Sequence, residues 1–323
     1  MSRPFAILLA AVYFGISATP VFAQVQTTEV LTDAQLAEAT TRPVRIRETT
    51  PEFAGVVNQV GEFAKKYGPE NVLLVVDLDN TLLAMNQDLG SDQWFSWQEA
   101  LQNSNPTHPE LVAADFGGLL EIQGILFALS RMHPPEPGLP DLVEDLVTRK
   151  ITTVVLTSRG KEFRDAAERE LKRNKYNISP STLEIHEKRG VFSPYSAEHP
   201  GKHGLSAEII DDLGSPRRVT YSEGIYMTAG QHKGYMLKTL LSRSTKASAD
   251  KPLAHFKAIV FVDDHQKHVD RMHEAFAGDS IDLATFRYSR EDENVEKFNK
   301  STKRHVIRDW ELLNGFIKTV LVK

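Results

Sequence analysis

The chain has 323 residues, a formal net charge of −5 and no cysteine, so it can bury a large core but has no disulfide framework. Its mildly acidic balance, without a basic stripe of interleaved aromatic residues, excludes nucleic acid as an expected partner. No cysteine- or histidine-based zinc pattern is present either.

Residues 1–23 have the pattern of a secretory signal peptide, with a positive start, an apolar run over 5–16 and predicted cleavage after Ala23. The apolar run is too short for a membrane span, which needs about 20 residues. We therefore expect an exported protein, periplasmic or secreted, with no stable membrane span after cleavage. Residues 24–50 are polar and weakly patterned, and predict an extended lead-in.

Helical spacing of apolar residues over 51–67 predicts a helix packed on a sheet, and the apolar run 71–76 predicts a buried strand. Asp77 and Asp79 follow that strand directly. Ligands of open α/β sheets bind beyond the carboxyl ends of the strands, so we expect both carboxylates to face one pocket. Such a pair holds Mg²⁺, attacks an electrophile or transfers protons. The alternative is two ordinary polar residues at a strand-to-loop junction.

The segment between this strand and the next is longer than the single helix that a crossover connection needs. Its excess, residues 84–137, predicts an inserted helical cap with an apolar helix over 111–132. The cap also contains Trp94, Phe95 and Trp97. We expect these aromatic residues to form the core of the cap, with a roof over the active site as the alternative.

The second apolar strand, residues 151–156, ends in Thr157 and Ser158 before a predicted helix over 161–175. Hydroxyls and free backbone N–H groups at such a turn suit a phosphate, although the same residues also cap helices. Arg159 follows them. It is expected either to bind a substrate phosphate or carboxylate, or to form a surface ion pair with the acids that follow it.

Residues 175–222 are rich in turn residues and predict an irregular excursion with short strands. A short strand and a glycine-flanked loop then place Lys233 at the start of a helix, where its charge can neutralise phosphate or carboxylate; Lys238 on that helix is the alternative. A third strand, residues 258–262, ends in Asp263 and Asp264. We assign no role to the nearby histidines His255, His265, His268 and His273.

Beyond this strand, residues 280–287 predict one more strand, 289–304 a charged solvated stretch and 308–321 an amphipathic closing helix. The whole pattern predicts an α/β fold with a doubly wound (Rossmann-like) parallel sheet and helices on both faces. The predicted core comprises residues 51–83 and 138–323, and the cap is inserted between these two parts.

The order DLDNTL, strand plus TSRG, loop plus Lys-Gly and strand plus DD resembles the four-motif pattern of the haloacid dehalogenase superfamily of phosphatases, most closely a branch of its exported bacterial members, over about residues 71–290. The resemblance implies that Asp77 is the nucleophile and forms an aspartyl-phosphate, and that Asp79 is the acid/base. It also implies a set of phosphate-binding residues and a set of Mg²⁺ ligands. The phosphate-binding residues that it implies are Thr157, Ser158 and Lys233. The Mg²⁺ ligands that it implies are Asp77, the Asp79 carbonyl and Asp263, with Asp264 as a further candidate.

These residues predict an exported Mg²⁺-dependent phosphatase that hydrolyses a phosphomonoester, either a small phosphorylated molecule or a phosphoprotein. One alternative is a phosphotransferase or mutase of the same fold, which differs in what attacks the aspartyl-phosphate. Another is a non-catalytic exported binding or host-interaction protein that uses the cap as its surface.

Overall fold

The computed structural model describes residues 42–186, 190–246 and 255–321. The fold below is that of the compact unit Pro43–Lys323. The predicted signal peptide, its cleavage site and residues 24–41 of the lead-in lie outside the described residues. Within the described part, none of the helices combines the length and the apolar composition that crossing a membrane requires.

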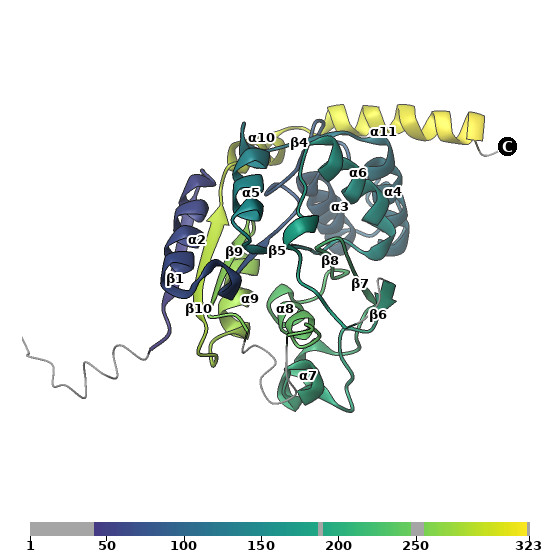
Figure 1. Cartoon of the computed structure of the whole chain (residues 1–323). Helices are drawn as coiled ribbons and strands as arrows, with labels where there is room; N and C mark the ends of the chain where they lie inside the picture. Colours follow the sequence, from purple (N-terminus) through teal and green to yellow (C-terminus); the bar gives the residue numbers. More distant parts are fainter. Residues whose placement is uncertain (1–41, 187–189, 247–254, 322–323) are drawn as a thin grey trace, which may run out of the picture. The chain divides into compact units, whose positions relative to one another are not determined.

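The centre of the fold is an eight-stranded sheet whose middle strands are parallel (Figure 1). All neighbouring pairs from β1 to β8 in the sheet order are parallel, whereas β7 and β6 add an antiparallel edge, so the sheet is mixed. The predicted α/β class is confirmed. In sheet order the strands are β1 (Arg45–Thr50), β10 (Asp282–Tyr288), β9 (Ala258–Asp263), β2 (Val72–Val76), β5 (Thr152–Thr157), β8 (Ile225–Met227), β7 (Val219–Ser222) and β6 (Gly190–Phe192).

The sheet is buried between two hydrophobic clusters, and the alternation of side chains along a strand explains why. In β2, Val72, Leu74 and Val76 belong to one cluster, whereas Leu73 and Val75 belong to the other. Helices α2 (Ala54–Tyr67), α5 (Leu139–Thr148) and α6 (Arg164–Arg173) contribute to the first cluster. Helices α7 (Ala207–Leu213), α8 (Lys233–Leu241) and α9 (Gln266–Ala275) contribute to the second.

Two segments differ from the sequence-based expectation near the sheet. The end of the lead-in is extended as predicted, but Arg45–Thr50 is β1, an edge strand paired in parallel with β10. The turn-rich region contains the expected short strands β6 and β7, together with helix α7. Short 3-10 helices complete the connections: η1 (Pro69–Asn71), η2 (Lys161–Phe163), η3 (Ser179–Ser181) and η4 (Pro200–His203).

The inserted segment between β2 and α5 carries two helices, α3 (Asp92–Ser104) and α4 (Phe116–Leu129), between the paired strands β3 (Ala84–Met85) and β4 (Met132–His133). Helix α4 begins later than predicted because the Asp115 side chain caps it, accepting a hydrogen bond from Gly118 N at 2.8 Å. Trp94 is only 1% exposed and belongs to a hydrophobic cluster, as the core interpretation predicts.

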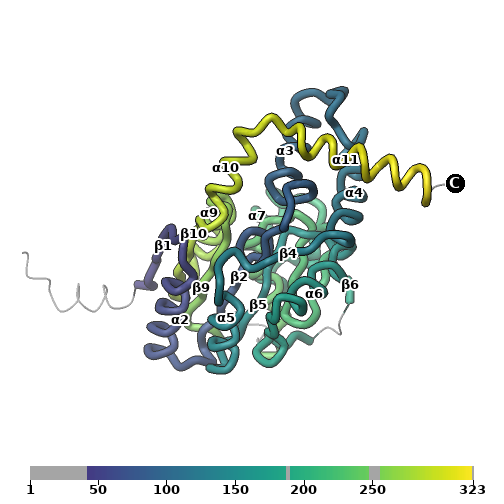
Figure 2. Tube along the Cα trace, turned by 90° about the horizontal axis from the view of Figure 1, so that it is seen from above, coloured from purple at the N-terminus to yellow at the C-terminus, as the bar shows by residue number. Residues whose placement is uncertain are grey.

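That cluster also includes residues from the end of the chain. Phe298 of α10 (Asp292–Lys300) and Val306 of α11 (Arg304–Phe316) are buried with Trp94. The tube in Figure 2 shows α10 and α11 running from β10 towards α3 and α4. The stretch predicted to be solvated therefore forms a helix, and the closing helix begins at Arg304 and ends in a π-helical turn, η5 (Ile317–Leu321).

Candidate active site

The sequence-predicted acids meet at one edge of the sheet because their strands are parallel and in register. Val76, the last residue of β2, pairs with Val262 of β9 and Val155 of β5. The Asp77 backbone continues the ladder, donating to Val262 O at 2.9 Å. The residues after these three strands therefore lie side by side, as expected at the carboxyl edge of an open α/β sheet.

Lys233 joins Asp77 to Asp263 at this edge. Its Nζ lies 2.5 Å from Asp77 Oδ1 and 2.6 Å from Asp263 Oδ2, and all three side chains are at least 95% buried. Burial lowers the pKa of Lys233, but the two carboxylates outweigh it and raise this pKa above its usual value. The lysine is therefore a fixed cation between two acids.

The two carboxylates differ in how well they are satisfied. Asp263 also accepts from His265 N at 2.9 Å and contacts His268 Nδ1 at 3.0 Å. Burial works against its ionisation, but Lys233 and then His268 outweigh burial and hold the pKa of Asp263 below its usual value. Burial raises the pKa of Asp77 to about 7, and Lys233 only partly offsets this. Among the described residues, Lys233 is the ion-pair partner of the Asp77 carboxylate. Asp77 is therefore the less occupied of the two acids.

Lys233 reaches this position because α8 starts beside α9 at very short range. His232 caps the helix, accepting from Tyr235 N at 3.3 Å. At Gly234 an added Cβ would lie 2.4 Å from Arg271 O and 2.6 Å from Ala275 Cβ, so only glycine fits. The alternative residue, Lys238, pairs with Asp279 at 2.7 Å instead. In the Lys-Gly pair, Lys233 therefore supplies the charge, and Gly234 allows α8 to pack closely against α9.

We expect Gly234→Ala to lower the free energy of unfolding by about 1–3 kcal/mol, because the methyl group overlaps backbone that cannot move freely. Chemical denaturation measures this loss. Gly278→Ala is the matched control, since no atom lies within 4 Å of its added Cβ. Equal stability of the two variants would contradict the packing argument.

Asp264 extends the acidic group. Carboxylate oxygens of Asp77, Asp263 and Asp264 all lie within 4.8 Å of one another. Asp264 is 9% exposed, and within the described part of the chain its Oδ1 is buried without a hydrogen-bond donor. Burial raises the pKa of Asp264 well above its usual value, and the nearby acids add to this effect. His265 Nε2 lies 3.9 Å from the other Asp264 oxygen, Oδ2, so the unsatisfied atom is Oδ1. Three carboxylates gathered in this way could hold a hard divalent cation, which prefers oxygen ligands.

Thr157 and Ser158 lie at the end of β5, next to the loop after β8. Thr228 N donates to Thr157 O at 3.0 Å, and Gly230 N donates to Ser158 O at 2.7 Å. Thr157 is 1% exposed, and its Oγ1 accepts from Arg159 N at 3.1 Å, as a turn-capping hydroxyl does. Within the described ranges no acceptor is bonded to its hydroxyl proton, so the cap and phosphate interpretations are compatible.

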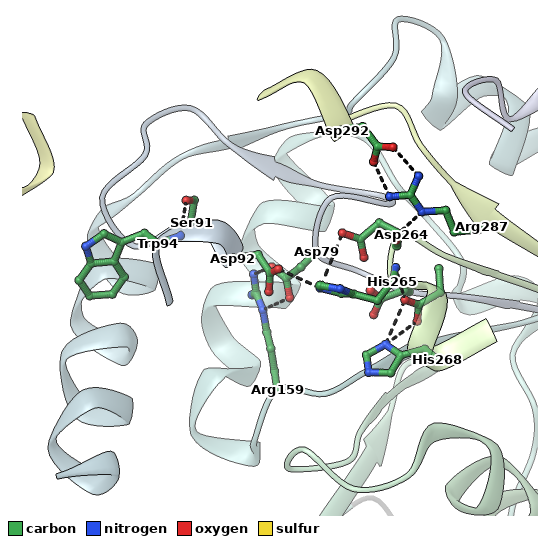
Figure 3. A network of polar contacts seen from close by, with 12 residues as sticks. Asp79, Ser91, Asp92, Trp94, Arg159, Asp264, His265, His268, Arg287 and Asp292 are labelled. Atoms are coloured by element: carbon green, nitrogen blue, oxygen red, sulfur yellow. Dashed lines mark hydrogen bonds and ion pairs between the residues drawn. The ribbon is translucent and has the colours of Figure 1, made fainter. Parts of the chain in front are cut away.

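Arg159 and Asp79 form a partly buried ion pair. Arg159 Nε donates to Asp79 Oδ2 at 2.9 Å and Nη2 to Oδ1 at 2.5 Å, a two-bond fork (Figure 3). The surface ion pair considered for Arg159 is wrong, because the side chain is 4% exposed and its guanidinium lies 3.7 Å from the centre of the Phe127 ring. Asp79 thus faces Arg159 rather than standing free.

Two histidines that received no role also lie here. His268 contacts both oxygens of Asp263, at 3.0 and 3.1 Å. His265 Nε2 lies 3.0 Å from Asp92 Oδ2 at the start of α3, and this contact raises the pKa of His265 to about 10 against the effect of burial. Figure 3 shows the contact between His265 and Asp92. A sequence signal exists only for His268, which lies in the first turn of the helix after Asp263; the partner of His265 is far away in the sequence.

Comparison with known proteins adds a family assignment. No curated protein matches the chain. Residues 49–319 match the family described as "Protein of unknown function (DUF2608)". The match covers well over half of the chain and includes Asp77, Asp79, Thr157, Lys233 and Asp263. The chain therefore belongs to the DUF2608 family.

Proposed function

We propose that the protein is an exported, Mg²⁺-dependent phosphatase that hydrolyses a phosphomonoester through an aspartyl-phosphate on Asp77. The observation that carries the proposal is the buried Asp77–Lys233–Asp263 contact beside Asp264, whose Oδ1 has no hydrogen-bond donor among the residues that the structure describes. The resemblance of the motifs around these residues to haloacid dehalogenase phosphatases supports the same reaction.

The residues divide the reaction between them. An Asp77 oxygen attacks phosphorus, and the bond from phosphorus to the leaving oxygen breaks while Asp79 supplies the proton that this oxygen needs. Water then attacks the aspartyl-phosphate, Asp79 takes up a proton from it, and inorganic phosphate leaves. Lys233 and the Thr157 and Ser158 hydroxyls stabilise the phosphoryl oxygens by charge and hydrogen bonds.

A divalent cation would be held by Asp77, Asp263 and Asp264, with the Asp79 carbonyl as a further oxygen ligand. Bound there, it supplies positive charge against the phosphate oxygens. Without added positive charge, a phosphate dianion would meet the negative charge of several buried acids at once.

Chelation tests the proposal directly. We expect EDTA to stop phosphate release from a panel of phosphomonoesters, and Mg²⁺ added in excess to restore it. Zn²⁺ and Ca²⁺ serve as comparison ions, because they prefer other ligand sets or geometries. Turnover that survives complete chelation would contradict the proposal. Substrate consumption without free phosphate would indicate transfer to another acceptor.

A further inference from the structure

Arg159 occupies an unusual position for a residue that binds the acid/base. Its side chain is 4% exposed, whereas that of Asp79 is 21% exposed, so Asp79 is the partner on the open side of the pair. Two nitrogens of the Arg159 guanidinium, Nε and Nη2, donate hydrogen bonds to Asp79. Nη2 also contacts Met132 Sδ at 3.7 Å. Within the described residues, the third nitrogen, Nη1, is buried and has no acceptor.

A buried guanidinium N–H without an acceptor is costly, and it indicates that the ion pair with Asp79 does not satisfy this arginine fully. A second anion could accept from Nη1 and replace one or both bonds to Asp79. The flat guanidinium is already held against the Phe127 ring at 3.7 Å, so it needs little ordering to receive a planar or tetrahedral oxyanion.

The position of Arg159 tells which part of a substrate such an anion would belong to. The side chain comes from the loop after β5, but Phe127 and Met132 belong to α4 and β4 of the inserted segment. The phosphoryl group is expected at Asp77 and Lys233, which form a separate ion-pair cluster with Asp263. Arg159 therefore lies against the inserted segment, where we expect the leaving group of a substrate whose phosphoryl group is at Asp77.

The fork also restrains Asp79. Both of its carboxylate oxygens point at Arg159, so the side chain must turn away from at least one of these bonds to reach a leaving oxygen. An acidic group of the substrate that takes over Arg159 would release Asp79 at the moment when the leaving group is in place.

Resting on the proposed phosphatase function, we propose that Arg159 exchanges Asp79 for a second acidic group of the substrate, so that the preferred substrates are phosphomonoesters whose leaving group carries a carboxylate or another phosphate. Arg159 is then a specificity-determining residue, and it positions Asp79 in turn.

Matched substrates test this. Phosphoglycolate is compared with ethyl phosphate for the carboxylate, and ethylene glycol bisphosphate with ethylene glycol monophosphate for the second phosphate. We expect kcat/KM to be about 10- to 100-fold higher for the doubly acidic member of at least one pair, the size of a charge-assisted hydrogen bond. The pair that shows the preference identifies the acidic group.

In Arg159→Gln the ratio of the two kcat/KM values should fall to about one, mainly because kcat/KM for the doubly acidic substrate decreases. Arg159→Lys should retain part of the preference, because lysine keeps the charge but cannot form the two-bond fork. Arg149→Gln, which removes an exposed ion pair with Asp145, should leave the ratio unchanged. A ratio near one in the unmodified protein for both pairs, or a ratio that survives in Arg159→Gln, would overturn the role of Arg159 and leave the phosphatase intact. No phosphate from any substrate would overturn both proposals.

Discussion

Asp77→Asn lowers kcat/KM for phosphate release by about 10⁴-fold or more, because the amide cannot attack phosphorus. Asparagine has nearly the shape of aspartate, and Lys233 keeps Asp263 as a partner at 2.6 Å. The variant should therefore fold, and removal of one of two neighbouring buried acids should also reduce their mutual repulsion.

Initial rates of phosphate release with saturating Mg²⁺ measure the loss of activity, and thermal melting of the same samples shows whether the variant is folded. Asp145→Asn is the control, since Asp145 is a half-exposed acid whose partner is Arg149. Full activity of a folded Asp77→Asn protein would remove Asp77 as the nucleophile.

Lys233→Met is expected both to abolish phosphate release and to lower the free energy of unfolding by about 3–5 kcal/mol, because it leaves two buried carboxylates without their shared cation. Methionine fills a similar volume, so packing contributes little to the loss. The carboxylates it would leave are those of Asp77 and Asp263, which are 5% and 0% exposed.

The same helix supplies the control. Lys238→Met removes a lysine that pairs with Asp279 and not with the acids of the site. Both side chains of this pair keep some solvent contact, so we expect the change to cost about 1–2 kcal/mol, less than Lys233→Met, and to leave turnover unchanged. Denaturant titration and phosphate release, run side by side, separate the two lysines. Equal behaviour of both variants would show that Lys233 is not part of the site.

The fold class could be predicted from local signals in the sequence, whereas the meeting of Asp77, Lys233 and Asp263 was implied by the resemblance of their motifs to those of the haloacid dehalogenase superfamily. Short apolar runs that end in acids, with glycine and lysine in the loop between them, specify parallel strands and their carboxyl edge. The structure adds the reason for the Lys-Gly pair: Gly234 approaches α9 so closely that a larger residue would not fit.

The remainder depends on pairings between distant segments. The sequence of Arg45–Thr50 is polar, and only its partner β10 makes it a strand. Helix α10 has a charged exposed face and becomes stable through Phe298, which packs against the inserted segment. For Arg159 the sequence leaves two alternatives, a substrate anion or an ion pair with the acids that follow it, but the carboxylate that it binds lies 80 residues earlier, on Asp79. No periodicity or spacing specifies such a contact.

The location of the phosphoryl group tests the central claim most directly. Asp79→Asn should slow breakdown of the intermediate by about 10²–10⁴-fold, so a phosphomonoester and Mg²⁺ should leave phosphate on the protein long enough for peptide mass spectrometry. The account predicts one phosphoryl group, on Asp77, and none in the Asp77→Asn, Asp79→Asn double variant. Turnover with no phosphorylated peptide, or with the phosphate on another residue, would contradict it.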